Sequence, residues 1–171
     1  EGDKDKILGA ISFLEQYNIT SELELGKNVA VVGGGNSAMD AARAAKRVRG
    51  VENVYIVYRR TKEYMPADKE ELELALEDGV VFKELLSPIS LKNGKLTCQV
   101  LELGEVDSSG RRKPVAKEGE FVDIEIDTVL AAIGEKVDYD VLKQNGINVD
   151  ENGSIAINPD TYETNMENVF I

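Results

Sequence analysis

A glycine-rich turn between two apolar segments constrains the fold of this chain more than any other feature of its sequence. The turn is Gly33-Gly34-Gly35, and it directly follows an apolar run, 28–32, that is rich in β-branched residues. Such a run predicts a strand buried on both faces, as in a parallel sheet. An apolar stripe with helical spacing follows the turn: Ala38, Ala41, Ala42, Ala45 and Val48. The order strand, glycine turn, helix indicates a βαβ unit.

The small residues of this turn match the dinucleotide-binding pattern G-x-G-x-x-G/A. Gly33 permits the tight turn, Gly35 lets a pyrophosphate approach the backbone, and Ala38 lets the helix pack closely on the strand. Amides that are free at the start of the helix point toward the phosphates. The predicted contact residues are Gly33, Gly34, Gly35, Asn36, Ser37 and Ala38. The alternative is a glycine-rich turn that binds no ligand.

Two arginines, Arg59 and Arg60, follow the next predicted strand, 53–58. An NAD site usually places Asp or Glu there to bind the ribose 2′-hydroxyl. A carboxylate would repel a 2′-phosphate, whereas a guanidinium group donates charge-assisted hydrogen bonds to it. The arginines therefore predict NADP(H) as the ligand. The alternative is a solvated strand end in which one or both arginines pair with Glu63 or Glu70.

Apolar periodicity predicts the other elements of the sheet and its helices. Further helices are expected over 5–17, 67–78 and 139–144. The continuous apolar run 128–133 predicts another strand of the central sheet, because a strand covered on both faces needs no polar alternation.

An antiparallel element interrupts this parallel pattern. Asn93-Gly94 separates two strand-like runs and is a strong hairpin signal. The polar segment 104–119 predicts a long loop, and 121–126 alternates as a half-buried strand. The predicted fold class is α/β with three layers: helices, a Rossmann-like parallel sheet, and an antiparallel meander over roughly 88–127. We expect a single domain over 1–171.

Missing residue types exclude several classes of site. The chain has no His, and Cys98 is its only cysteine. A Ser-His-Asp triad, a Cys–His pair or a His-ligated metal therefore cannot be built, and one thiol cannot hold an iron–sulfur cluster. No catalytic residue and no metal site is predicted. Cys98 is expected to be a buried structural thiol, and such sparse cysteine use fits a reducing cytoplasm.

Charge and hydropathy exclude two classes of partner. The 20 Lys and Arg against 32 Asp and Glu give a net charge of −12, which repels nucleic acid and anionic membranes. No apolar run approaches the roughly 18 residues of a membrane span, and the first residues do not resemble a signal peptide. We expect no nucleic-acid or membrane partner and a cytoplasmic location. Because the chain lacks an initiator Met and ends on an apolar run, we also expect it to be a piece of a longer protein.

A set of motifs that spans nearly the whole chain resembles one family. The motifs are Val31 to Asp40, Tyr58-Arg59-Arg60-Thr61, Tyr64-Met65-Pro66-Ala67, Gly79-Val80-x-Phe82, Ser109-Gly110-Arg111-Arg112-x-Pro114 and Ala131-Ala132-Ile133-Gly134-Glu135. Together they resemble the NADPH-binding domain of the glutamate synthase small (beta) chain family of FAD/iron–sulfur oxidoreductases. Tyr64 to Asp68 and Gly110 to Val115 are most similar to a selenate reductase flavoprotein subunit.

The resemblance implies a fold of the pyridine nucleotide-disulfide reductase type, in which the NADPH domain is inserted into an FAD domain. FAD-binding segments would then lie on both sides of this chain, and iron–sulfur clusters would lie elsewhere in the parent. It also implies that Ala131 to Glu135 line the nucleotide site, which adds Ala132, Ile133 and Gly134 to the expected cofactor contacts.

The function implied by the resemblance is NADPH binding and hydride delivery to FAD, with the isolated chain inactive by itself. The expected partners are NADP(H), the FAD domain of the same parent chain and an acceptor subunit. Two alternatives are a non-enzymatic NADP(H)-sensing or interaction module and a Rossmann methyltransferase. A methyltransferase would need an acidic residue after the second strand, where Arg59 lies.

Overall fold

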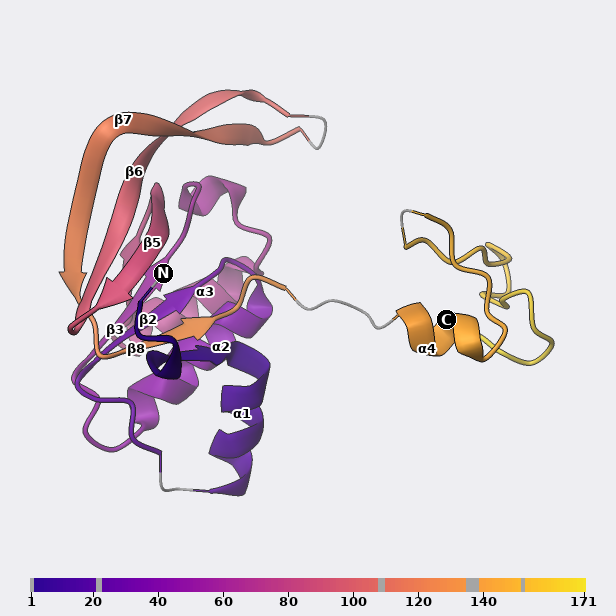
Figure 1. The fold of residues 1–171 in the computed structure, drawn as a ribbon, viewed down its shortest axis with the longest axis horizontal. Coiled ribbons are helices and arrows are strands. Elements are labelled where there is room, and N and C mark those ends of the chain that lie inside the picture. The colour runs from indigo at the N-terminus through magenta and orange to yellow at the C-terminus, as the bar shows by residue number, and fades with distance from the viewer. Residues whose placement is uncertain (1, 21–22, 108–109, 135–138, 152) are drawn as a thin grey trace. The chain divides into compact units, whose positions relative to one another are not determined.

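The computed structural model describes residues 2–20, 23–107, 110–134, 139–151 and 153–171 (Figure 1). Two units are distinguished by their internal contacts, Glu1–Ile133 and Gly134–Ile171. The first unit contains every residue of the glycine turn and both arginines of the predicted site.

A five-stranded parallel sheet lies at the centre of the first unit. Its middle strand is β2 (Asn28–Val32), which pairs with β3 (Asn53–Val57) on one side and with β8 (Thr128–Ala131) on the other. The outer strands are β1 (Ile7–Gly9), beside β8, and β4 (Val81–Lys83), beside β3. The order is therefore β1-β8-β2-β3-β4, which confirms the predicted parallel sheet.

Three helices cover one face of this sheet: α1 (Ala10–Ile19), α2 (Asn36–Arg47) and α3 (Lys69–Glu77) (Figure 1). The alanines of α2 are buried, and their small side chains let the helix lie close to the strands. Asp78 joins α2 to the end of α3, because its carboxylate lies 2.9 Å from both Arg43 and Arg47. Hydrogen bonds from these two guanidinium groups lower the pKa of Asp78.

An antiparallel meander covers the opposite face. It consists of β5 (Leu86–Lys92), β6 (Lys95–Val106) and β7 (Arg112–Glu125). Side chains of both sheets form a second apolar cluster: Ala30, Val57, Val129, Leu91, Leu96, Cys98 and Ile126. The predicted three-layer α/β architecture is confirmed, and so is the hairpin at Asn93-Gly94, whose residues both have positive φ.

Two predicted elements differ from the structure. The helix expected over 5–17 begins only at Ala10, because residues 7–9 form β1 and satisfy their backbone groups by pairing with the exposed side of β8. The loop expected over 104–119 is largely strand: β6 continues to Val106 and β7 begins at Arg112 (Figure 1). An antiparallel ladder needs no apolar pattern where both of its faces are solvated, so polarity alone is a poor loop signal there.

The second unit contains α4 (Tyr139–Gln144), as predicted, followed by isolated bridges between Val149 and Ile155 and between Glu163 and Phe170. The turn expected at Asn152-Gly153 is described only at Gly153, since Asn152 lies outside the described residues. None of the helices in the described ranges has the length and apolar character that a membrane crossing requires.

The buried thiol of Cys98 gives a direct test of the packing between the two sheets. The side chain is fully buried, and burial raises its pKa to about 11 from 9.0, with a smaller contribution from the charge of Asp123. At pH 8 the reactive thiolate is therefore about a hundredfold scarcer than in the unfolded chain. We expect slow reaction with a disulfide reagent in native buffer and fast reaction in urea.

The same shift predicts how stability depends on pH. The unfolded thiol loses its proton near pH 9 while the folded one keeps it to about pH 11. The free energy of unfolding should therefore fall over this interval, and Cys98→Ala should remove that part of the pH dependence. If Cys98 reacted with the disulfide reagent as fast in native buffer as in urea, its burial between the two sheets would be contradicted.

Candidate functional site

Gly33 and Gly34 of the turn are required by the protein's own packing. A Cβ on Gly33, which has φ +153°, would lie 2.3 Å from the carbonyl oxygen of Ala132, and one on Gly34 would lie 2.4 Å from the ring of Tyr58. The amide of Gly33 donates to Val57, and the carbonyl of Gly34 accepts from Ala67. These two glycines hold the turn against its neighbouring segments.

Gly35 differs, because a Cβ placed there would have no atom of the described chain within 4 Å. Its backbone, φ −93° and ψ 176°, is extended and suits any residue. Gly35 is also the N-cap of α2 and has no side chain to cap the helix. Packing within this chain therefore does not explain the glycine, whereas close approach of a ligand would.

The first residues of α2 include backbone amides without a partner among the described residues. Ala38 and Met39 donate their amides back to the carbonyl of Gly35, while the amides of Asn36 and Ser37 have no partner among the described residues. Two open N–H groups and the positive end of a helix dipole suit an anionic oxygen. Ala38 is fully buried, in line with its predicted packing task.

The side chain of Asn36 has a structural partner. Its amide nitrogen donates to the carboxylate of Asp68 at 3.0 Å, and its amide oxygen accepts from the backbone of Asp68 at 2.9 Å. Asp68 is the N-cap of α3. Only the backbone of Asn36 is therefore free to meet a ligand, and its side chain fixes the position of α3 beside the turn.

The two arginines after β3 lie in different environments. Arg59 is exposed, and its side chain has no hydrogen bond or ion pair among the described residues. Arg60 is only 5% exposed and binds the carboxylate of Asp107 and the carbonyl of Arg112, both at 2.8 Å. Of the two arginines predicted to bind a 2′-phosphate, Arg59 is therefore exposed, whereas Arg60 is engaged within the chain. Neither arginine pairs with Glu63 or Glu70, as the alternative required.

The end of β8 carries the remaining predicted contacts. Ala132 donates its amide to the carbonyl of Val32 at 2.8 Å, which places its backbone beside the turn, and Ile133 is 78% exposed. Gly134, with φ +96°, begins the second unit. Glu135 lies outside the described residues, so its role in the site stays a prediction.

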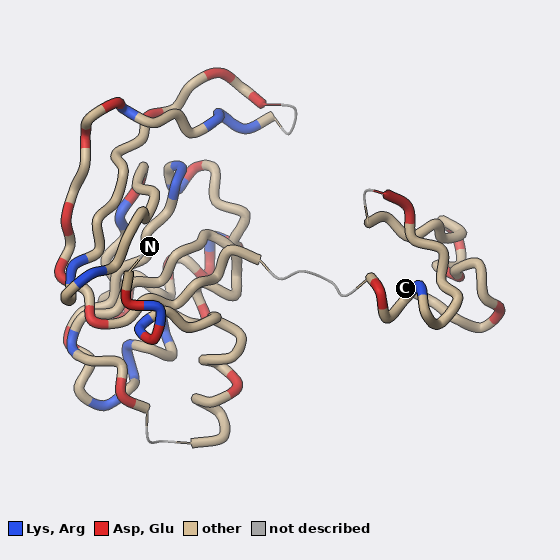
Figure 2. The backbone as a smooth tube through the Cα atoms, viewed as in Figure 1, with Lys and Arg blue, Asp and Glu red and all other residues tan. Residues whose placement is uncertain are grey.

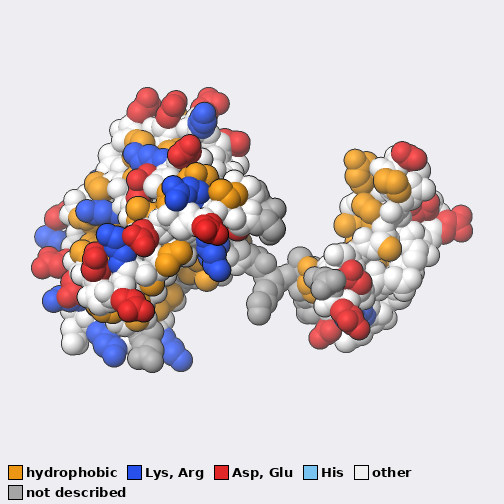
Figure 3. Space-filling view, turned by 90° about the horizontal axis from the view of Figure 1, so that it is seen from above, with side chains coloured by type: hydrophobic (Ala, Val, Ile, Leu, Met, Phe, Trp, Pro, Cys, Tyr) orange, Lys and Arg blue, Asp and Glu red, His pale blue; other side chains and the backbone are white. Residues whose placement is uncertain are grey.

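Two lysines, Lys62 and Lys83, were not among the predicted site residues. The ammonium groups of Lys62 and Lys83 lie 5.3 Å and 5.8 Å from the ring centres of Phe82 and Tyr55. Lys62, Phe82 and Lys83 also line an open pocket of about 680 Å³ between β4 and the meander. The sequence does not indicate these contacts between lysine and aromatic ring, because each aromatic partner is distant from its lysine along the chain. Basic and acidic side chains are otherwise interspersed over the first unit (Figures 2 and 3).

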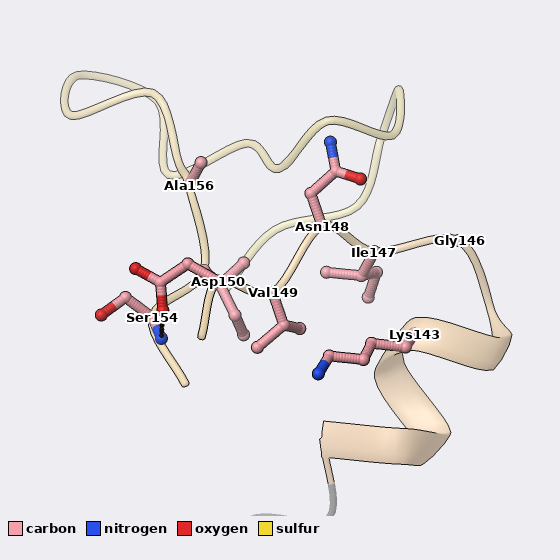
Figure 4. Close-up of a pocket in the computed structure, with 9 residues that line it drawn as sticks. Lys143, Gly146, Ile147, Asn148, Val149, Asp150, Ser154 and Ala156 are labelled. Carbon is pink, nitrogen blue, oxygen red and sulfur yellow. Dashed lines mark hydrogen bonds between the residues drawn. The ribbon is translucent and has the colours of Figure 1, made fainter. Parts of the chain in front are cut away.

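A separate pocket lies within the second unit (Figure 4). Lys143 extends from α4 beside Ile147 and Val149, and the amide of Ser154 donates to the carboxylate of Asp150 at 2.7 Å. None of the predicted site residues lines this pocket. Across the described ranges, no group of three or more Cys, Asp or Glu side chains could hold a metal ion.

Comparisons with known proteins identify similar chains. The family model described as pyridine nucleotide-disulphide oxidoreductase matches residues 1–171. The protein YgfK of Escherichia coli (strain K12) is 45% identical over 171 residues, which cover 99% of this chain and 16% of YgfK. The glutamate synthase [NADPH] small chain of the same organism is 32% identical over 155 residues, which cover 85% of this chain and 33% of that protein.

A solved structure gives the same fold. Mycobacterium tuberculosis FprA in complex with NADPH superposes with a TM-score of 0.68 at 20% identity, over 92% of this chain and 50% of FprA. The chain therefore spans only a fraction of the length of the proteins that it matches.

The contrast between Gly33 and Gly35 predicts that alanine substitutions at the two positions differ in their effect on the free energy of unfolding. Gly33→Ala forces a Cβ into the Ala132 carbonyl, so we expect it to lower the free energy of unfolding by about 1–3 kcal/mol. Gly35→Ala should change it by less than about 0.5 kcal/mol. Urea unfolding followed by circular dichroism measures both. A loss at Gly35 as large as that at Gly33 would show that packing within the chain requires a glycine at position 35 as well.

Proposed function

Because the chain belongs to the pyridine nucleotide-disulphide oxidoreductase family, we propose that the sheet edge around Gly35 and Arg59 binds NADPH and presents it to an FAD held by the rest of a longer protein. The observation that carries the proposal is the open approach to Gly35 at the uncapped start of α2. A pyrophosphate fits there for two reasons: no side chain blocks it, and the amides of Asn36 and Ser37 can donate to it.

Arg59 supports the choice of NADPH over NADH. It follows β3, which lies next to β2, so its guanidinium group belongs to the strand end where an adenosine ribose is bound in such folds. The group is exposed and has no partner in the described ranges, and a 2′-phosphate would give it a bidentate partner. The glutamate synthase relative carries NADPH in its name, which favours the same nucleotide here.

The chemical contribution of this chain is binding and orientation. Bound NADPH would supply a hydride, and the role of this chain's own residues would be to bind and orient it. The turn holds the pyrophosphate, Arg59 holds the adenosine end, and the backbone at Ala132 and Ile133 borders the site beside β8. We propose that FAD, iron–sulfur clusters and an acceptor subunit belong to the longer cytoplasmic protein, and that this chain alone is inactive.

Gly35→Val tests the pyrophosphate site. A valine side chain would occupy the space in front of the free amides, so affinity for both NADPH and NADH should fall at least about a hundredfold while the fold is kept. Gly9→Val is the matched control, because Gly9 is the extended N-cap of α1 and its Cβ would make only an ordinary contact. Unchanged NADPH binding in a folded Gly35→Val protein would refute the site.

Arg59→Ala tests the choice of nucleotide. A hydrogen bond to a charged group contributes roughly 1.5–3 kcal/mol, so NADPH affinity should fall about ten- to hundredfold while NADH affinity changes little. Salt should narrow the gap, since the arginine is exposed. The control is Arg49→Ala, which removes the same charge beyond the other end of α2. Calorimetric titration decides: equal losses for both nucleotides would exclude 2′-phosphate recognition by Arg59.

A further inference from the structure

Arg60 is the only charged side chain that is buried among the described residues. Its guanidinium group donates to the carboxylate of Asp107 and to the carbonyl of Arg112, both at 2.8 Å. A buried charge that loses its partner is costly, so this side chain cannot leave Asp107 readily to meet an external phosphate. Its contacts instead join the end of β3 to a segment about fifty residues away in sequence.

That segment is the tip of the β6–β7 hairpin, which extends beyond the end of β5 (Figure 1). Asp107 closes the tip: its carboxylate accepts from the amide of Arg111 at 3.2 Å, and its backbone amide donates to the carbonyl of Arg111 at 2.8 Å. One carboxylate therefore both shapes the hairpin tip and holds Arg60.

Arg59 lies between fixed neighbours. The backbone of Tyr58 bonds to Lys83 and to Leu86, and the amide of Lys62 donates to the carboxylate of Glu84 at 2.6 Å. Arg60 is fixed by its side chain. The backbone that carries Arg59 is thus held on both sides, while the Arg59 side chain has no hydrogen bond or ion pair with any described residue.

We propose that Arg60 and Asp107 form a positioning pair that orients Arg59 and thereby sets the preference for NADPH over NADH, without contacting the nucleotide. A long arginine side chain loses conformational entropy when it binds a ligand. If its backbone is already fixed, the total entropy lost on binding is smaller. The inference rests on the proposed function, because it assumes that Arg59 binds the 2′-phosphate. It assigns Arg60 a role different from that of its neighbour.

The competing role for Arg60 is that of a second phosphate ligand held in reserve by Asp107. The two roles predict opposite effects of Asp107→Asn, which keeps the shape of the side chain and removes its charge. If Arg60 and Asp107 form a positioning pair, Asp107→Asn lowers the protein's preference for NADPH over NADH. If Arg60 is a reserve ligand, Asp107→Asn raises that preference, because Arg60 is released toward the phosphate.

The experiment measures the affinity of the chain for NADPH, NADH and adenosine 2′,5′-bisphosphate by calorimetric titration. In Asp107→Asn we expect the NADPH-to-NADH affinity ratio to fall roughly three- to thirtyfold, and binding of the bisphosphate to weaken in parallel. Asp107→Glu, which restores the charge, should recover part of the ratio. Asp123→Asn is the control, since it breaks an ion pair with Lys95 in the same meander and should leave the ratio unchanged.

Arg60→Met provides an independent variant, because it removes the charge at the other end of the pair and cannot bind phosphate. Loss of preference in both Arg60→Met and Asp107→Asn supports positioning. An unchanged or raised ratio in Asp107→Asn overturns it, whatever Arg60→Met does. Arg59→Ala, measured in the same way, distinguishes failure of the proposed function from failure of the positioning pair. If Arg59→Ala leaves the NADPH-to-NADH affinity ratio unchanged, the proposed function is wrong. If Arg59→Ala is the one variant that lowers the ratio, only the positioning pair is wrong.

Discussion

The close approach of two backbones, at Gly33 and Ala132, is the contact on which the arrangement of the site depends. β2 and β8 run parallel side by side, and the chain leaving β2 must turn within the space that the end of β8 allows. A residue with a side chain at position 33 would push the strands apart or move the turn. The start of α2 would then no longer lie at the edge where Gly35 is open.

Packing within the chain and the proposed ligand binding make separate demands on this turn. At Gly33 and Gly34 a Cβ would collide with other atoms of the protein. At Gly35 a Cβ would have no described atom within 4 Å, yet the residue is still glycine. The backbone and side chain of Asn36 also differ: its backbone amide has no partner among the described residues, while its side chain hydrogen-bonds to Asp68. In a chain with a net charge of −12, the edge proposed to bind the nucleotide combines two amides and one arginine side chain, Arg59, that have no partner among the described residues.

The local structure of the candidate site was predictable from the sequence, because the turn, the strand before it and the helix after it lie within twenty residues. The divergence of Arg59 and Arg60 was not, since the partner of Arg60 lies at Asp107 and no pattern near Arg60 indicates it. Similarly, β1 was mistaken for the first turns of α1 because its pairing with β8 depends on residues more than a hundred positions away. The extended hairpin was missed because ladder hydrogen bonds form between polar residues as readily as between apolar ones.

The fourteen-residue strand β7 is an outer strand of the meander, so one side of its backbone has no partner strand in the described part of the chain. Such an edge could recruit a strand from another molecule. Pro114 lacks an N–H group, Gly119 has φ +76°, and the register with β6 shifts twice along the strand. A foreign strand therefore meets an interrupted template with charged side chains on it, so β7 can be long without making the protein prone to edge-to-edge association.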